Sequence, residues 1–303
     1  MEKISFDGKV VIVTGAGAGL GREYALEFAK RGASVVVNDL GVARDGSGST
    51  SSAADTVVEE IKNLGGKAVA NYDSVATPEG GNNIVKTAVD AFGTVDVLVN
   101  NAGFLRDKSF AKMTIDEWDA VMSVHLRGAF CVTQPAVAVM REHNYGRIIV
   151  TSSTSGIFGN FGQSNYGAAK MGLVGFMNVL KLEVSKFNVH INAIAPNAYS
   201  RMTENLIPKE LAPKLQAKFN VPMVVYLCSE ECKENGSIFT MGAGWYAKTA
   251  VVCAPGACLG DGSRDIPAEE VRENFARITD LAGARPLNNN LETFEFMGPL
   301  LAK

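Results

Sequence analysis

The feature that most constrains the fold is a regular alternation of short apolar runs with longer amphipathic segments. The apolar runs are strand candidates at 10–15, 34–39, 67–75, 95–103, 146–153 and 190–196. Helix candidates follow the first two strands at 21–32 and 51–66, and each ends on glycine. Strands that are apolar throughout are typical of parallel sheets covered on both faces. The pattern predicts an α/β fold, with a doubly wound parallel sheet and helices on both faces.

The alternation stops at about residue 250, which indicates how the chain is divided. A length of 303 residues is enough for one large α/β domain. We expect that domain at 1–250 and a C-terminal helical extension at 251–303 that packs on it. Within the extension, 266–283 is expected to form one amphipathic helix. Residues 45–52, "DGSGSTSS", are expected to form a flexible loop.

Charge and composition argue against several classes of protein. The net charge of −3 is unlike that of a nucleic-acid-binding surface. No apolar run approaches the ~20 residues of a membrane span. The first strand begins so early that we expect no secretory signal peptide, and the final "LAK" does not match the S-K-L peroxisomal signal. The pairs Cys228/Cys232 and Cys253/Cys258 have no histidine nearby, so we expect reduced thiols and no metal site.

Three glycines, Gly15, Gly19 and Gly21, directly follow the first strand. Such glycines let the backbone approach a pyrophosphate, and the helix that begins there offers free N–H groups and the positive end of its dipole. With Asp39 at the end of the second strand, they predict a Rossmann-type dinucleotide site. The Asp39 carboxylate would accept hydrogen bonds from the ribose hydroxyls of NAD and repel the extra phosphate of NADP. No Lys or Arg lies between Gly15 and Gly19 to offset it, so we expect NAD.

A serine, a tyrosine and a lysine form the candidate catalytic group. Tyr166 and Lys170 are four residues apart, so on a helix they share one face. A free tyrosine, with a pKa of ~10, is a poor base at neutral pH, and a nearby ammonium lowers that pKa. We expect Lys170 to supply this charge and to hydrogen-bond the nicotinamide ribose. Ser153 would hold the substrate oxygen while Tyr166 exchanges the proton.

These motifs resemble those of the short-chain dehydrogenase/reductase family, whose catalytic triad has the spacing Ser-x12-Tyr-x3-Lys. The resemblance implies that the segment around Asp73 meets adenine and that the NNAG turn at 100–103 meets the nicotinamide ribose. It also implies that 196–203 covers the nicotinamide, although Pro196-Asn197 stands where the family usually has Pro-Gly. The expected cofactor contacts are Gly15, Gly19, Leu20, Gly21, Asp39, Asp73, Ser74, Asn101, Ala102, Gly103, Tyr166, Lys170, Ala198 and Ser200.

Longer segments narrow this resemblance. "VVVNDLG", "SGIFGNFGQSNYGAAK" and "MGAGWYAK" are similar to the dehydrogenase part of the multifunctional enzymes of peroxisomal fatty-acid β-oxidation. The similarity implies NAD-dependent oxidation of (3R)-3-hydroxyacyl-CoA to 3-ketoacyl-CoA, with hydride leaving C3 as Tyr166 takes the hydroxyl proton. Those enzymes continue into a hydratase, whereas this chain stops at Lys303. A hydratase domain or protein of the same pathway is therefore an expected partner.

Other functions fit the same motifs. A 3-oxoacyl-carrier-protein reductase would run the reverse reaction with NADPH, and Asp39 argues against it. A steroid dehydrogenase would use the same pocket chemistry, and a nucleotide-binding regulator would use the fold without catalysis. Arg106, Lys108 and Lys112 follow the NNAG turn. They would either meet the phosphates of CoA or form a solvated charged loop.

His125 is not the expected base, because Tyr166 fills that role. By resemblance, it stands where the family has an asparagine at a helix bend, which helps to hold a water near the active lysine. Two roles are open for His125. It holds that water beside Lys170 through a ring nitrogen, or it fills the bend.

The resemblance also implies a homodimer formed through two long helices, at about 105–140 and 164–187. The apolar and small residues of "YGAAKMGLVGFMNVL" are consistent with a helix buried on two sides. A tetramer remains an alternative. Localisation follows from the pathway alone, and is peroxisomal in a eukaryote and cytoplasmic otherwise.

Overall fold

The computed structural model describes residues 2–41, 48, 52–199, 208–261 and 263–301. The chain divides into two compact units, Met1–Lys248 and Thr249–Lys303. The predicted loop at 45–52 lies almost entirely outside the described residues. That the C-terminal extension packs on the first unit stays a prediction.

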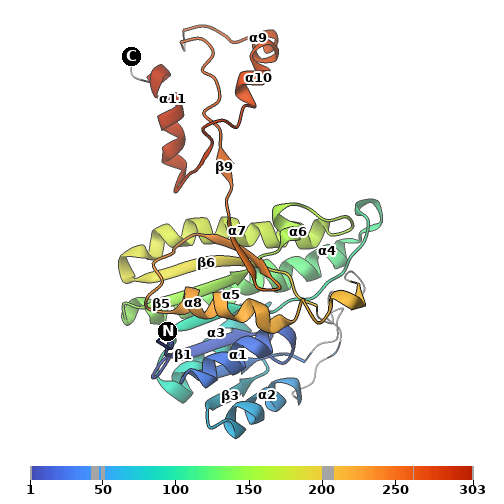
Figure 1. Ribbon diagram of the computed structural model, residues 1–303, viewed down its shortest axis with the longest axis vertical. Helices are drawn as coiled ribbons and strands as arrows, with labels where there is room; N and C mark the ends of the chain where they lie inside the picture. The colour runs from blue at the N-terminus through green and yellow to red at the C-terminus, as the bar shows by residue number, and fades with distance from the viewer. Residues whose placement is uncertain (1, 42–47, 49–51, 200–207, 262, 302–303) are drawn as a thin grey trace. The chain divides into compact units, whose positions relative to one another are not determined.

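An eight-stranded sheet forms the centre of the first unit (Figure 1). Its strands are β1 (Val10–Thr14), β2 (Ser34–Asn38), β3 (Lys67–Asn71), β4 (Val97–Asn100), β5 (Gly146–Thr151), β6 (Val189–Pro196), β7 (Ile238–Gly242) and β8 (Trp245–Thr249). Their order is β3-β2-β1-β4-β5-β6-β7-β8, and every pair from β3 to β7 is parallel. The predicted doubly wound parallel sheet is confirmed.

The sequence pattern does not predict β7 and β8. Ala243 (φ 52°) and Gly244 (φ 81°) join them, and two successive positive φ angles are the geometry of a tight type I′ hairpin. β8 carries the exposed side chains of Trp245 and Tyr246. It therefore lacks the continuous apolar run that marks the other strands.

Helices cover both faces of the sheet, as predicted. In the first unit they are α1 (Gly19–Lys30), α2 (Ser52–Asn63), α3 (Pro78–Phe92), α4 (Ile115–Met122), α5 (Gly128–Glu142), α6 (Thr154–Ile157), α7 (Ser164–Val184) and α8 (Val221–Cys228). Short 3₁₀ turns are η1 (Phe110–Lys112), η3 (Ser185–Phe187), η4 (Lys209–Leu211) and η5 (Ala217–Asn220).

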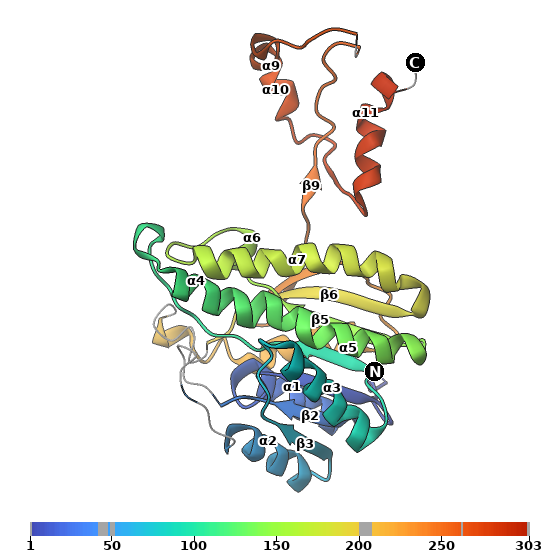
Figure 2. The ribbon, with the colours of Figure 1, turned by 180° about the vertical axis from the view of Figure 1, so that it is seen from behind.

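Alternate residues of β1 enter two separate apolar cores. Val11 and Val13 pack with residues of α1, α2 and α8, a layer that faces the viewer in Figure 1. Val10 and Ile12 pack with residues of α3, α5 and α7, the layer in front in Figure 2. Both faces of the strands are buried, which explains their continuous apolar sequences.

A single helical path runs from α4 to α5 through a π-helical turn, η2 (Ser123–Arg127). It begins at Ile115 because the side chain of Thr114 accepts the N–H of Glu117, and the side chain of Glu117 accepts the N–H of Thr114. The helix therefore starts later than the predicted 105–140. The wider turn of η2 contains His125, and such π turns often accompany functional sites.

The second unit contains β9 (Val252–Cys253), β10 (Arg285–Pro286), α9 (Ala268–Glu273), α10 (Phe275–Ile278), η6 (Asn290–Glu292) and α11 (Thr293–Leu301). The prediction of one helix over 266–283 is wrong, because the helix is interrupted at Asn274 (φ −98°, ψ 6°). The Asn274 side chain donates to the carbonyl of Glu270 over 2.9 Å. Such local bonds compete with the backbone ladder of a helix.

The order of the strands reverses at β1. The chain continues from β1 to β2 and β3 on one side, and then returns to β4 on the other side of β1. In open α/β sheets, ligands bind at the carboxyl ends of the strands where the order reverses. The turns after β1, β4 and β5 therefore define the candidate site.

Candidate active site

The turn after β1 leaves no space for a side chain at Gly15 or Gly21. A Cβ on Gly15 (φ 63°) would lie 2.7 Å from the Cα of Ala102. A Cβ on Gly21 would lie 2.2 Å from the carbonyl oxygen of Gly15. α1 begins at Gly19, and the residue before it, Ala18, makes no side-chain cap. The first N–H groups of the helix are therefore available to an anion, and this cradle fits the pyrophosphate of a dinucleotide.

The carboxylate of Asp39 is held by two backbone donors. Gly17 donates its N–H to Oδ2 and Gly41 donates its N–H to Oδ1, each over 2.7 Å. A Cβ on Gly17 would lie 2.8 Å from Oδ2, so only glycine allows this approach. The two donors fix the carboxylate beside the glycine turn, and each oxygen keeps a lone pair for a hydroxyl. Gly17 was missed by sequence reasoning, although it is a fourth glycine in the same short motif.

Thr14, the last residue of β1, organises the turn after β4. Its hydroxyl oxygen accepts the backbone N–H of Asn101 over 3.0 Å and that of Ala102 over 3.1 Å. The side chain of Asn101 donates back to the carbonyl of Thr14 over 2.9 Å. Thr14 was also missed, because it reads in sequence as the end of a buried strand. These bonds place Asn101, Ala102 and Gly103 against the glycine turn.

Asp73 lies two residues beyond the end of β3, which stops at Asn71 rather than running on as predicted. Its carboxylate accepts the side-chain N–H groups of Asn71, over 2.8 Å, and of Asn83, over 3.0 Å. The hydroxyl of Ser74 accepts the N–H of Ala76 over 3.2 Å. Asp73 and Ser74 are thus fixed in place, and their contact with adenine stays a proposal.

A cavity of about 230 Å³ opens beside these turns, and it brings the three predicted catalytic residues together. Ser153 is the N-cap of α6, where its hydroxyl accepts the N–H of Ser155 over 3.1 Å. Tyr166 and Lys170 come from the first turns of α7. The other expected cofactor contacts that line this cavity are Leu20, Asn101, Gly103 and Ala198.

The pKa of Tyr166 is raised to about 12, because burial outweighs the hydrogen bond with Ser153 that lowers it. The charge of Asp107 adds to the increase. This is the opposite of the expected lowering by Lys170. The Lys170 ammonium lies 5.3 Å from the centroid of the Tyr166 ring, and it is not itself firmly charged.

Lys170 is 3% exposed, and burial lowers its pKa from 10.5 to about 7. Its Nζ donates to the carbonyl oxygen of Thr151 over 2.6 Å, and the hydroxyl of Ser152 donates to the carbonyl of Lys170 over 2.8 Å. No carboxylate among the described residues pairs with it. The lysine therefore titrates near neutrality.

His125 is buried, and its Nε2 lies 2.8 Å from the carbonyl oxygen of Phe104 and 3.1 Å from its backbone nitrogen. Burial, with the charge of Lys170 as a second cause, holds the pKa of His125 well below its usual value. The ring is therefore neutral near pH 7. A Cβ on Gly103 would lie 2.1 Å from His125 Cε1, so the ring packs directly on the NNAG turn.

The Nδ1 atom of His125 is buried and has no hydrogen-bond partner. His125 also lines a small space of about 10 Å³, together with Asn100, Thr14 and Lys170. A space of roughly 10–15 Å³ with polar partners is the minimum that holds one water. This geometry fits the first of the two roles considered for His125.

The turn after β6 closes another side of the cavity with Pro196, Asn197 and Ala198. Asn197 donates its N–H to the carbonyl of Met241 over 2.7 Å, and Asn220 donates its side-chain N–H to the carbonyl of Asn197 over 3.3 Å. These bonds fix the start of the predicted nicotinamide-covering segment. Residues 200–203 of that segment, which include the expected contact Ser200, lie outside the described residues.

The candidates for contact with the phosphates of CoA follow the NNAG turn, and Lys112 among them ends the 3₁₀ turn η1. Lys108 and Lys112 are exposed, and the Arg106 guanidinium carbon lies 5.3 Å from the centroid of the Phe104 ring. Their contact with CoA stays a prediction.

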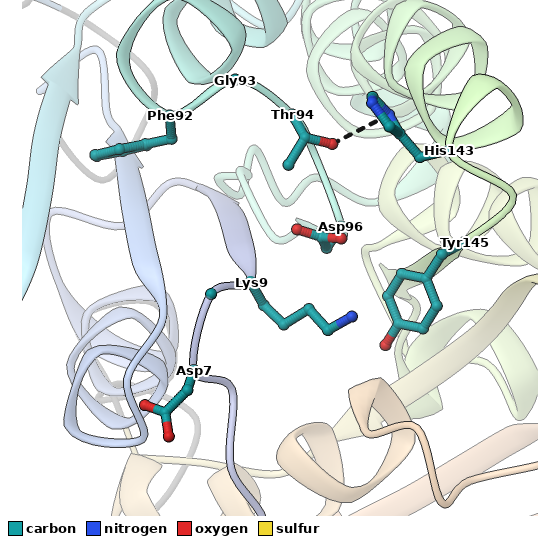
Figure 3. A pocket seen from close by; sticks show the side chains of 9 residues that line it. Asp7, Lys9, Phe92, Gly93, Thr94, Asp96, His143 and Tyr145 are labelled. Carbon is teal, nitrogen blue, oxygen red and sulfur yellow. Dashed lines mark hydrogen bonds between the residues drawn. The ribbon is translucent and has the colours of Figure 1, made fainter.

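A second cavity, of about 410 Å³, is formed by residues that precede β1, β4 and β5. In Figure 3 its polar groups face one another: Thr94 contacts His143 over 3.3 Å, and Asp96 lies near Lys9 and Tyr145. Asp96 already accepts the N–H of Val10 over 2.8 Å, and Lys9 pairs with Glu230 over 2.8 Å. The cavity is larger than the first but holds no member of the predicted catalytic group.

Two kinds of feature are absent from the part of the chain that the structure describes. Within it, no group of three or more His, Cys, Asp or Glu residues could hold a metal ion. None of its helices is long and apolar enough to cross a membrane.

Comparison with known proteins identifies the family that the fold and site define. Residues 9–211 match the short chain dehydrogenase family, and the chain belongs to that family of oxidoreductases. It is 53% identical over 281 residues to peroxisomal multifunctional enzyme type 2 of Mus musculus. This match covers 93% of this chain and 38% of the mouse protein. It is also 53% identical over 277 residues to a short-chain type dehydrogenase/reductase of Mycobacterium tuberculosis, covering 91% and 96%.

Solved structures give the same family. Full-length peroxisomal multifunctional enzyme type 2 from Drosophila melanogaster matches with a TM-score of 0.84 and 43% identity, over 99% of this chain and 50% of that one. A 7α-hydroxysteroid dehydrogenase complexed with NADH and 7-oxo glycochenodeoxycholic acid matches with a TM-score of 0.71 and 28% identity, over 79% and 95%. The chain thus spans 38% of the mouse multifunctional enzyme and 50% of the Drosophila one. The predicted resemblance is confirmed, and the family, with NADH in this neighbour, supports a nicotinamide cofactor.

Proposed function

We propose that this chain is an NAD-dependent dehydrogenase that oxidises (3R)-3-hydroxyacyl-CoA to 3-ketoacyl-CoA in fatty-acid β-oxidation. The observation that carries the proposal is the cavity that Ser153, Tyr166 and Lys170 line together with Asn101 and Gly103 of the NNAG turn. The similarity to peroxisomal multifunctional enzymes supports the substrate class. A 3-oxoacyl-carrier-protein reductase is disfavoured by the carboxylate at Asp39.

The cofactor side of the site favours NAD over NADP. The Asp39 carboxylate, fixed by Gly17 and Gly41, would bind the adenosine ribose hydroxyls. It would repel the added phosphate of NADP, because two anions at close range in a partly buried site repel strongly. The uncapped start of α1 and the tight glycine turn would hold the pyrophosphate.

The cofactor, when bound, supplies the acceptor for the hydride from C3. The chain's own residues handle the proton and the geometry. The hydroxyl of Ser153 would hold the substrate oxygen, and the phenolic oxygen of Tyr166 would take the hydroxyl proton. With the pKa of Tyr166 at about 12, this transfer requires stabilisation of the phenolate, which a protonated Lys170 would give.

A proton path beyond Lys170 follows from its pKa of about 7. A lysine with a pKa near neutral pH would pass on the proton that Tyr166 receives. The neutral His125 ring would hold a water for that transfer in the small space that it lines with Asn100 and Lys170. The nucleotide-binding regulator is disfavoured, because it would need none of these groups.

We also propose a homodimer. The path from α4 to α5 and the helix α7 expose Phe130 (47%), Val179 (58%) and Leu182 (53%). An open hollow of about 440 Å³ lies among residues of the same helices. Exposed apolar patches of this kind mark protein interfaces. A molar mass of one chain in light scattering at micromolar concentration would contradict the dimer.

Localisation and pathway partners follow the proposed function. The similar mouse enzyme is peroxisomal by name, while another relative is bacterial. We therefore propose a peroxisomal enzyme in a eukaryotic source and a cytoplasmic one otherwise, acting beside a hydratase that supplies its substrate.

Among the alternatives, the steroid dehydrogenase is supported by the structural match to a 7α-hydroxysteroid dehydrogenase. The deciding experiment compares NADH formation from 3-hydroxyacyl-CoA and from a 7α-hydroxysteroid. The proposal expects activity with the thioester and little with the steroid. The reverse preference would replace the proposed function with the steroid reaction.

A further inference from the structure

One wall of the active-site cavity carries a chain of three hydrogen-bonded side chains. The side-chain N–H of Gln163 donates to the carboxylate of Asp107 over 2.9 Å. The carbonyl oxygen of Gln163 accepts the side-chain N–H of Asn160 over 3.1 Å. Gln163 is 4% exposed, and Asn160 lies on the exposed rim. Both line the cavity that contains Ser153 and Tyr166.

The backbone holds this wall in place. Lys108 donates its N–H to the carbonyl of Gly162 over 2.9 Å, which joins the loop after β4 to the loop before α7. Gly159 (φ 86°) and Gly162 (φ 79°) shape the turn that carries Asn160, in a backbone region that favours glycine. The side chains of the chain are therefore presented from a fixed frame.

The direction of the chain is set at one end. An ionised carboxylate only accepts hydrogen bonds, so Gln163 must turn its NH₂ group toward Asp107. Its carbonyl then faces Asn160, which must turn its own NH₂ group toward Gln163. The amide orientations, otherwise ambiguous by a flip, are fixed in sequence. The carbonyl oxygen of Asn160 and its second N–H are left over, and that oxygen is an acceptor.

We infer that Asn160 is a specificity-determining residue that accepts a hydrogen bond from an amide N–H in the thioester arm of the substrate, and that Asp107, through Gln163, keeps it an acceptor. The inference rests on the proposed function. A CoA thioester carries such an amide a few bonds from its sulfur, on the part that leaves the cavity for solvent. Asn160 is exposed and lines the same cavity as the reacting groups, so it is accessible to the part of a substrate that reaches solvent. Asp107 and Gln163 act as positioning residues.

The test uses two small substrates with the same acyl group. The N-acetylcysteamine thioester of (R)-3-hydroxybutyrate has the amide N–H, and its S-ethyl thioester lacks it. The measured quantity is the ratio of kcat/KM for the first over the second, with NAD. For the unmodified protein we expect a ratio of about five to ten, the size of one net hydrogen bond.

Three variants separate the roles. Asn160→Ala should bring the ratio close to one, because the acceptor is lost. Asp107→Asn should also lower it, since an asparagine at that position donates as well as accepts and allows both downstream amides to flip. Asp116→Asn, an exposed carboxylate at the start of α4, is the matched control and should keep the original ratio. Any effect of the Asp107 charge on Tyr166 changes both substrates equally and cancels in the ratio.

The outcomes are distinguishable. A ratio near one in the unmodified protein, or an unchanged ratio in Asn160→Ala and Asp107→Asn, overturns the inference and leaves the proposed function standing. Absence of NADH formation from both thioesters and from 3-hydroxyacyl-CoA overturns the proposed function itself.

Discussion

The ring of His125 meets the ring of Tyr166 edge-on, with their centroids 5.2 Å apart and the planes at 87°. The same histidine leaves its buried Nδ1 without a partner, beside Lys170 and a space large enough for one water. Within a mostly apolar lining, Thr14, Asn100 and Lys170 give this space the polar groups that a bound water would need. The contact between His125 and Tyr166 therefore places the candidate base, Tyr166, next to a buried imidazole ring.

The role of His125 can be tested by removing the ring nitrogen. We expect His125→Ala to lower kcat about tenfold, the cost of roughly one lost hydrogen-bonding group, with KM for NAD little changed. His125→Asn should restore much of the loss, because the amide also binds a water. Full activity in His125→Ala, at an unchanged melting temperature, would leave His125 as a packing residue.

The proposed base is tested by Tyr166→Phe, which removes only the hydroxyl. NAD binding, measured by the quenching of protein fluorescence, should be retained because the glycine turn and Asp39 are unchanged. Turnover should fall by about a thousandfold or more, within the range for a lost general base and its proton transfer. A folded variant that turns over normally would exclude Tyr166 from catalysis.

The low pKa of Lys170 has a consequence for stability. Burial lowers that pKa from 10.5 to about 7, so the unfolded chain binds this proton more tightly than the folded protein. Stability attributable to Lys170 should therefore rise with pH between these two values. The free energy of unfolding can be measured with denaturant at pH 7 and pH 9. Between these values it should rise by about 2 kcal/mol more in the unmodified protein than in Lys170→Met. The exposed Lys214→Met is the control, and an equal pH slope in all three proteins would contradict the buried, titrating lysine.

Cofactor choice should depend on the contact between Gly17 and Asp39. Gly17→Ala adds a Cβ that would lie 2.8 Å from Oδ2 of Asp39, so the carboxylate must move. We expect the NAD over NADP ratio of kcat/KM to fall about tenfold, as for the loss of one good charged contact, and to fall further in Asp39→Ala. Gly298→Ala has open space around its Cβ and should leave the ratio unchanged. An unaltered preference in both site variants would remove Asp39 from cofactor selection.

Much of the fold and the core of the site could be predicted from the sequence. The six predicted strands, the helices on both faces of the sheet and the grouping of Ser153, Tyr166 and Lys170 all follow from local patterns, namely apolar runs and fixed spacings. Such patterns can be recognised in the sequence because they depend on residues close together in the chain.

What could not be predicted depends on contacts between distant segments. The sequence indicates a core residue at Thr14, and its role is visible only from its hydrogen bonds with Asn101. The role of Gln163 is likewise visible only from its hydrogen bond to Asp107. The pKa of Tyr166 follows from burial that no spacing reveals. The break at Asn274 depends on a side-chain bond that outcompetes a regular amphipathic pattern.

The central claim is the reaction itself, and NAD reduction by the two enantiomers of 3-hydroxyacyl-CoA tests it most directly. The assay follows the absorbance of NADH with (3R)- and (3S)-substrates of several chain lengths, at saturating NAD. The proposed function predicts NADH formation from the (3R) series, with kcat/KM at least about a hundredfold above the (3S) series, as expected when one configuration places C3 correctly. NADH formation from neither series, or a preference for (3S), would contradict it.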